Sequence, residues 1–175
     1  MAAAPRLLPG LPPYGPSAVS FSSSGYGAHR EGVVIEFESV DGHRWVGNFQ
    51  RGGTTFDAVL TTFAIDRPVI VAGGRAYLLD ATSRTVIAEF GDYVIWAVEW
   101  RDTIVLADEL RFEALNRNGV VWRSERVSWD GMRDLSLDGS FVRGFAFSPI
   151  DNDYYRFVLD LETGSFTGGS YNGPK

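Results

Sequence analysis

The chain has 175 residues, a formal net charge of −6 and no cysteine. This length is typical of one domain with its own core, and an apolar content of 45% excludes general disorder. The lack of cysteine excludes disulfides and thiolate metal sites and fits a reducing compartment, so we expect a cytoplasmic protein. The acidic charge disfavours a general nucleic-acid binder, which carries a basic face, and favours a basic protein partner.

Arginine supplies all of the positive charge from Lys and Arg side chains except that of Lys175. Codon bias of the genome explains such a composition without reference to function. The alternative is a surface selected for contacts that arginine makes and lysine does not. These contacts are two-pronged hydrogen bonds and stacking on aromatic rings.

The first 28 residues differ in composition from the rest of the chain. Five prolines lie within the first sixteen residues, and a stretch rich in serine and glycine follows at 22–27. Proline favours extended geometry and lacks a backbone donor, so we predict an extended arm over 1–28 and a single all-β domain over 29–175. The alternative is that this arm is a docking segment for a partner, with residues 11–14, of sequence LPPY, making the contact.

Neither a leader peptide nor a membrane-spanning segment is expected from the apolar pattern. Leu7 and Leu8 are followed at once by Pro9 and Gly10, which is too short an apolar run for a leader peptide. No later apolar run is long enough to cross a bilayer. We therefore expect no membrane partner.

From residue 33 onward the apolar residues alternate with a period of two. Residues 33–38 and 43–49 flank Asp41-Gly42, and residues 69–72 and 76–79 flank Gly73-Gly74. Such pairs of strand-like runs joined by two turn residues predict β-hairpins, because both turn positions tolerate a positive φ.

The remaining runs follow the same pattern. Asn118-Gly119 predicts another tight turn, and residues 56–65 are the least clear strand. No window shows helical periodicity. We therefore predict an all-β protein, a single antiparallel meander of about ten to twelve short strands.

A weak internal repeat suggests how these strands are grouped. Turns follow an apolar run at Asp41, Asp80, Asn116 and Asp160, with spacings of 39, 36 and 44 residues. A period near 40 residues is the size of a four-stranded propeller blade. A sandwich or barrel built from regular hairpins has the same spacing, so both it and a small propeller-like arrangement stay open.

Several short runs resemble segments of small bacterial proteins of unknown function with propeller-like hairpin repeats. The runs are Glu31-Gly32, 45–49, Trp122-Arg123, 128–131 and 168–171. The resemblance covers nearly the whole chain after the arm, so it implies a single all-β domain. It implies no catalytic residue, because none is assigned in that family.

Familiar catalytic and metal-binding patterns are missing from the sequence. His29 and His43 have no spacing typical of zinc ligands. A triad of Ser128, His43 and Asp130 would lack the G-x-S-x-G turn that presents a nucleophile. Residues 151–162 resemble a calcium loop only in part, because Arg156 replaces its glycine. We therefore expect no catalytic residue, cofactor or metal.

Residues 122–130 contain the densest group of Trp, Arg and Asp side chains. In an unbroken strand alternate residues share a face, so Trp122, Ser124, Arg126, Ser128 and Asp130 would lie together. Trp and Arg are enriched at interaction hot spots. We predict a partner-binding surface at Trp122, Arg126, Ser128 and Asp130. The alternative is a sheet edge in which Asp130 only sets a turn.

These observations favour a non-enzymatic binding module that recognises a protein partner. One form of this hypothesis is a basic partner that the module neutralises. The first alternative is a small-molecule-binding domain with an aromatic pocket, built from some of the five Trp and seven Tyr residues. The second is a hydrolase that uses carboxylates, for example from Glu99, Asp102, Asp108 and Glu109. Carboxylates have no sequence signature unless they pair in space, so this alternative stays open.

Overall fold

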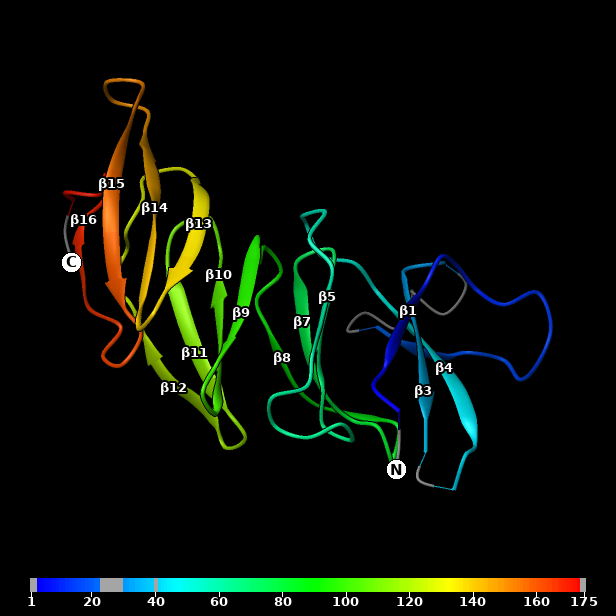
Figure 1. The fold of residues 1–175 in the computed structure, drawn as a ribbon. Coiled ribbons are helices and arrows are strands. Elements are labelled where there is room, and N and C mark those ends of the chain that lie inside the picture. The colour runs from blue at the N-terminus through cyan, green and yellow to red at the C-terminus, as the bar shows by residue number, and fades with distance from the viewer. Residues whose placement is uncertain (1–2, 23–29, 40, 174–175) are drawn as a thin grey trace. The chain divides into compact units, whose positions relative to one another are not determined.

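The computed structural model describes residues 3–22, 30–39 and 41–173, and within these ranges the chain is all-β (Figure 1). Sixteen strands form four sheets. The prediction of an all-β protein is confirmed, but the expected ten to twelve strands were too few. Four strands are only three residues long, which is too short for alternation to mark them. No helix in the described part of the chain could cross a membrane.

The sheets follow one another along the sequence. The first contains β1 (Arg6–Leu8), β3 (Val33–Glu38), β4 (Arg44–Phe49) and β2 (Val19–Phe21), in that spatial order. The second contains β5 (Ala58–Leu60), β6 (Val69–Ala72), β7 (Arg75–Asp80) and β8 (Thr85–Phe90). The third contains β9 (Trp96–Trp100), β10 (Thr103–Ala107), β11 (Phe112–Asn116) and β12 (Gly119–Arg123). The fourth contains β13 (Met132–Asp138), β14 (Phe141–Ser148), β15 (Asp153–Asp160) and β16 (Phe166–Gly168).

In the last three sheets each strand pairs with its neighbours in sequence, and all of these pairs are antiparallel. A four-stranded sheet of consecutive strands is the blade unit of β-propellers. A closed barrel would instead need one sheet without edges. The strand order therefore favours the small propeller-like prediction over the barrel.

The repeat of Asp and Asn residues corresponds to a shared turn. The side-chain oxygens of Asp80, Asn116 and Asp160 each accept a hydrogen bond from the backbone N–H two residues later, at 3.0, 2.8 and 2.8 Å. Asp41 accepts a longer bond from the His43 N–H, at 3.3 Å. Asp80, Asn116 and Asp160 each end the third strand of a sheet. The period near 40 residues is thus the repeat of one sheet.

The structure corrects part of the prediction that residues 1–28 form an extended arm. Its segments β1 and β2 are edge strands of the first sheet, paired with β3 and β4. Pro5 and Pro9 flank the three-residue strand β1, where their missing donors interrupt no pairing. The prediction thus treated β1 and β2 as lying outside the fold, whereas they complete the first sheet. Residues 23–29, which include His29, lie outside the described part of the chain.

Residues Met1–Val94 form one compact unit and Ile95–Lys175 another, and we name them the N-terminal and C-terminal units. The core of the N-terminal unit joins its two sheets through aromatic rings. Phe49 stacks on Phe21 at 4.6 Å between centroids and lies 5.4 Å from Tyr77 in the second sheet. That these two units form a single domain over 29–175 stays a prediction.

The core of the C-terminal unit joins its third and fourth sheets in the same way. Phe112 on β11 and Phe157 on β15 are buried, with ring centroids 5.7 Å apart. Val142 and Ala146 on β14 point to the same core, while Phe141, Arg143 and Phe145 alternate with them toward the other face. The fourth sheet thus has one buried and one open face.

Candidate functional site

The predicted contact strand ends earlier than expected. Strand β12 stops at Arg123, and residues 124–131 form a loop before β13. Alternation of faces therefore does not continue past Arg123, and the proposed common face of Trp122, Arg126, Ser128 and Asp130 is wrong. Val121, which the same alternation would place on the opposite face, is 50% exposed.

Ser124 ends the strand with a mixture of backbone and side-chain hydrogen bonds to Phe112. Its N–H donates to the Phe112 carbonyl at 2.9 Å, and its Oγ accepts from the Phe112 N–H at 2.9 Å. The Ser124 Oγ donates in turn to the Glu125 carbonyl at 2.7 Å. Serine side chains compete in this way with regular sheet bonds. The chain therefore turns out of the sheet at this residue.

Ser128 is a structural residue of the loop and not a contact residue. It is completely buried, and its Oγ donates to the Gly131 carbonyl at 2.6 Å. The same oxygen accepts from the Asp130 N–H at 3.2 Å. An oxygen held in this way inside the protein is not accessible to a substrate, so the suggested triad with Ser128 as nucleophile is excluded.

Arg126 connects the loop of residues 124–131 to Tyr171, which follows β16. Its Nε donates to the Ser128 carbonyl at 2.9 Å, and one terminal nitrogen donates to the Trp129 carbonyl at 2.7 Å. Its guanidinium carbon lies 4.7 Å from the centroid of the Tyr171 ring and 5.4 Å from that of Trp129. The backbone N–H of Tyr171 donates to the Val127 carbonyl at 3.2 Å. The position of the guanidinium is therefore fixed by the protein itself.

Trp129 packs half-buried beside Arg126 rather than in the core. Its ring lies 4.5 Å from that of Tyr171 in an edge-to-face arrangement. Its backbone N–H donates to the Ser170 Oγ at 3.1 Å. The indole Nε1 is buried and has no hydrogen-bond partner among the described residues.

Trp122 lies on the last strand of the third sheet and contacts the turn after β15. Its indole Nε1 donates to the Leu161 carbonyl at 3.1 Å. A Cβ atom at Gly164 would lie 2.6 Å from the Trp122 ring, so only glycine allows this approach. Trp122 thus supports a turn that forms one side of a groove.

The groove has a volume of about 920 Å³ and is the candidate functional site of the C-terminal unit. Its walls come from Arg111 just before β11, from the end of β12 and the loop after it, and from residues between 163 and 173. Its charged and aromatic lining residues are Arg111, Arg123, Arg126, Glu125, Phe166 and Tyr171. The groove therefore combines three guanidinium groups with one carboxylate and two aromatic rings.

The three arginines of the groove differ in how they are held. Arg123 makes a two-pronged ion pair with Glu113, at 2.9 and 3.2 Å, and this carboxylate raises the pKa of the guanidinium. Arg126 is held by the two carbonyl oxygens described above. The exposed side chain of Arg111 has no ion pair within the described ranges. Arg111 is therefore the guanidinium most available to a ligand.

Of the four predicted contact residues, only Arg126 lines the groove. Trp122 supports a wall, Ser128 is buried beneath the loop, and Asp130 is exposed in the turn that leads to β13. The sequence interpretation missed Arg111 and Tyr171. Tyr171 follows Gly168-Gly169-Ser170, a run that is conspicuous in the sequence, but nothing in it indicates contact with Arg126.

The other suggested chemistry is not assembled in the described residues. No group of three or more His, Cys, Asp or Glu side chains there is placed to hold a metal ion. Residues of the suggested calcium loop form strand β15, and Glu162 pairs with Arg101 at 2.9 Å. Asp108, one of the candidate hydrolase carboxylates, instead accepts from the backbone N–H groups of Leu110 and Arg111, at 2.7 and 2.8 Å.

No protein-family model matches the sequence, and no curated protein matches it significantly. Among solved structures, the chain is similar to the N-terminal domain of Nup159, with a TM-score of 0.45 and 15% identity over 70% of this chain and 35% of that chain. A structure of S. cerevisiae Dbp5 bound to Nup159 and Gle1 matches with a TM-score of 0.44 and 15% identity, covering 68% and 34% of the two chains. Kluyveromyces lactis Hsv2 matches with a TM-score of 0.37 and 12% identity, covering 77% and 58%. The chain spans about a third of the length of the first two matched chains.

Proposed function

We propose that this protein is a non-enzymatic binding module that takes a segment of a protein partner into the groove of its C-terminal unit. The observation that carries the proposal is the set of three arginines and two aromatic rings in one groove of about 920 Å³. Arginine and tyrosine are the residue types that dominate binding energy at protein interfaces. A cytoplasmic bacterial setting, predicted from the sequence, is part of the same proposal.

The groove is organised before a partner arrives. Arg126 is already bonded to two carbonyl oxygens and Arg123 to Glu113, so their side-chain freedom is lost on folding and not on binding. Fixing a rotamer-rich side chain at an interface otherwise costs about 0.5–1.5 kcal/mol. Such preorganisation supports recognition of one defined segment.

The charge of the groove differs from that of the whole chain. The net charge of −6 attracts a partner that is basic overall, as proposed from the sequence. A basic segment placed in the groove itself would meet three guanidinium groups against the single lining carboxylate of Glu125, and like charges at an interface are unfavourable. We therefore propose that the inserted segment carries a carboxylate, which Arg111 pairs with, and that basic surface of the partner faces the acidic remainder of the protein.

The proposal is tested by purifying tagged protein from its source cells with three variants in parallel. The parent, Arg111→Glu and Arg117→Glu are compared by quantitative mass spectrometry of the proteins they retain. Arg117 lies exposed in the turn between β11 and β12, outside the groove, and its variant makes the same change of charge. We expect a partner retained by the parent and Arg117→Glu, and reduced about tenfold or more by Arg111→Glu.

Equal recovery of all retained proteins by the two variants would reject the groove as the binding site. Native mass spectrometry of the same samples tests the small-molecule alternative. A bound small mass that is lost only in Arg111→Glu, without any protein partner, would favour that alternative instead. The groove volume lies within the range of small-molecule sites, so this control is needed.

A further inference from the structure

The open face of the fourth sheet carries a continuous row of arginines and aromatic rings. The pairing register places Arg133, Phe145 and Arg156 side by side on β13, β14 and β15, and Phe147 beside Tyr154 on the next rung. These five residues, which we name the arginine–aromatic ladder, lie on the face opposite the core residues Val142 and Ala146.

The distances between its guanidinium groups and rings show that the ladder is a connected stack. The Arg133 guanidinium carbon lies 3.7 Å from the Tyr154 ring centroid and 5.8 Å from that of Phe145. Arg156 approaches the Phe145 ring at 5.7 Å, and the Phe147 and Tyr154 rings are 5.0 Å apart. A cation within about 6 Å of a ring centroid is attracted by the ring. The two cations therefore flank Phe145 from both sides.

The positive charge of the ladder is only partly neutralised by the chain. The side chain of Arg156 is exposed and has no ion pair among the residues that the structure describes. The only carboxylate paired with Arg133 there is that of Asp134, the next residue, at 3.6 Å. By contrast, Arg143 on the same face pairs with Asp138 at 2.8 Å. The unmet charge is thus concentrated on the two arginines beside Phe145.

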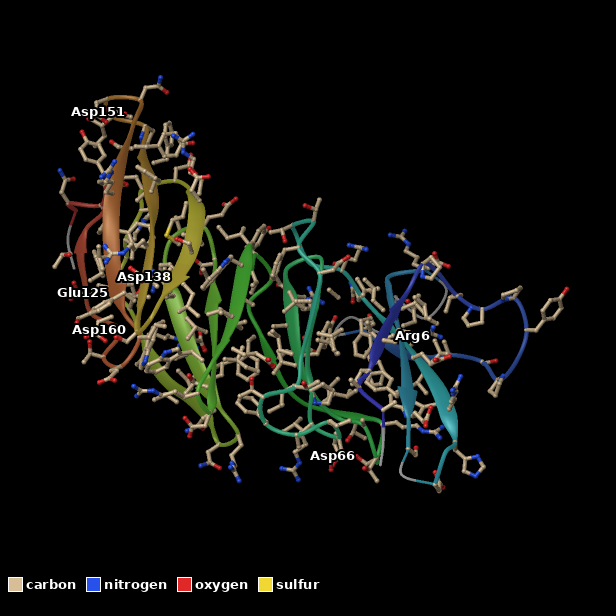
Figure 2. All side chains as sticks on the ribbon, viewed as in Figure 1. Arg6, Asp66, Glu125, Asp138, Asp151 and Asp160 are labelled. Carbon is tan, nitrogen blue, oxygen red and sulfur yellow. The ribbon has the colours of Figure 1, made fainter. Side chains whose placement is uncertain are left out.

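Apolar surface adjoins this charge toward the tip of the β14–β15 hairpin. Tyr154 is 37% exposed and Ile150, in the connecting loop, is 74% exposed. Figure 2 shows Asp151 at this tip and Asp160 near the base of the hairpin, and Figure 1 shows the tip extending beyond β13 and β16. A partner on this face would therefore meet two cations beside a wide aromatic and aliphatic surface.

We propose that the arginine–aromatic ladder is a second docking surface, and that its occupant is an extended protein segment with acidic and aromatic side chains two residues apart. Residues two apart in an extended segment point to the same side, so a carboxylate would pair with Arg133 and Arg156 while an aromatic ring packs on Tyr154 and Phe147. Arg143 is neutralised and Asp138 lies on the same sheet, which disfavours the polyanionic backbone of a nucleic acid. The ladder and the groove are separate surfaces, and neither proposal depends on the other.

The test uses the full chain and a fluorescein-labelled peptide built from the repeat Glu-Ser-Trp-Ser, with binding followed by fluorescence anisotropy. Two control peptides replace every Glu by Lys or every Trp by Ala, and a single-stranded oligothymidine is the nucleic-acid probe. We expect the first peptide to bind the parent more tightly than all three controls. We expect Arg133→Gln/Arg156→Gln to weaken binding about tenfold or more, since arginines at hot spots have effects of this size.

Arg117→Glu is the charge-matched control and should bind the peptide like the parent, whereas Arg111→Glu tests whether the peptide occupies the groove instead. Far-ultraviolet circular dichroism and melting curves verify that each variant is folded, and the single variant Arg156→Gln repeats the test at an exposed position if the double variant melts early. Absence of binding to the parent, equal binding by the lysine peptide, tighter binding of oligothymidine or an unaffected double variant would each overturn the proposal. Loss of binding only in Arg111→Glu would place the peptide in the groove and also overturn it.

Discussion

The guanidinium carbon of Arg126 lies 4.7 Å from the ring centroid of Tyr171, so a loop that follows the third sheet is joined to the end of the fourth. The same guanidinium donates to the carbonyl oxygens of Ser128 and Trp129. Two hydrogen bonds and a cation–ring contact thus converge on one side chain. Arg126 therefore has a structural role in addition to the role in binding that we propose for the groove.

Replacing Arg126 by alanine should therefore destabilise the C-terminal unit. The change leaves two loop carbonyls without their donors and removes the cover of the Tyr171 ring. A lost hydrogen bond from a charged group costs about 1.5–3 kcal/mol, so we expect a loss of about 2 kcal/mol in the free energy of unfolding. Chemical denaturation of the full chain measures it.

Arg126→Lys is the matched variant because it keeps the charge but not the two-pronged geometry. We expect it to recover less than half of the lost stability. Full recovery by lysine would show that charge alone, and not the forked contact with Ser128 and Trp129, holds the loop.

The sequence predicted the hairpins and the repeat because both depend on local chemistry. Asp41, Asp80, Asn116 and Asp160 set their turns through side-chain oxygens that accept from N–H groups two residues later. Such signals are complete within a few residues, so a single sequence contains them. The strand pairs that these turns join were predicted for the same reason.

The site was predicted less well because it depends on where a strand stops. Alternation assigned Ser128 to an exposed contact face, yet Ser128 is completely buried. The strand ends because Ser124 exchanges hydrogen bonds with Phe112, 12 residues away along the chain. Contact between distant residues has no local signature. The aromatic partner of Arg126 was missed for the same reason.

A second prediction concerns the segment that was expected to be an unpaired arm. Phe21 on β2 is 7% exposed and stacks on Phe49, whereas Tyr14 is 90% exposed. Phe21→Ala should cost about 3–5 kcal/mol as a core truncation, and Tyr14→Ala should leave stability nearly unchanged. Urea unfolding of both variants provides the comparison. Equal stability of the two variants would show that residues 1–22 contribute little to stability, as expected of an unpaired arm.

A third prediction separates backbone strain from steric contact at two glycines. Gly139 and Gly164 have φ values of 61° and 72°, where any other residue is strained by roughly 1–2 kcal/mol. A Cβ at Gly139 meets nothing within 4 Å, but one at Gly164 lies 2.6 Å from the Trp122 ring. Gly164→Ala should therefore lower the melting temperature clearly more than Gly139→Ala. Equal shifts in differential scanning calorimetry would mean that the Trp122 ring moves aside without cost.

The last prediction is a loss of stability at high pH that originates at Tyr77. Burial raises the pKa of this side chain to about 12, and its hydroxyl donates to the Gln50 carbonyl at 2.7 Å. The unfolded chain releases this proton near pH 10, so between about pH 10 and 12 the folded state binds more protons than the unfolded state. The stabilisation is complete below pH 10 and is lost as the pH rises toward 12, by roughly 2–3 kcal/mol in all. Tyr77→Phe removes the titrating group and should show a smaller loss over the same interval in urea unfolding at stepped pH. Parallel curves for the parent and the Phe variant would show that Tyr77 does not control the alkaline transition.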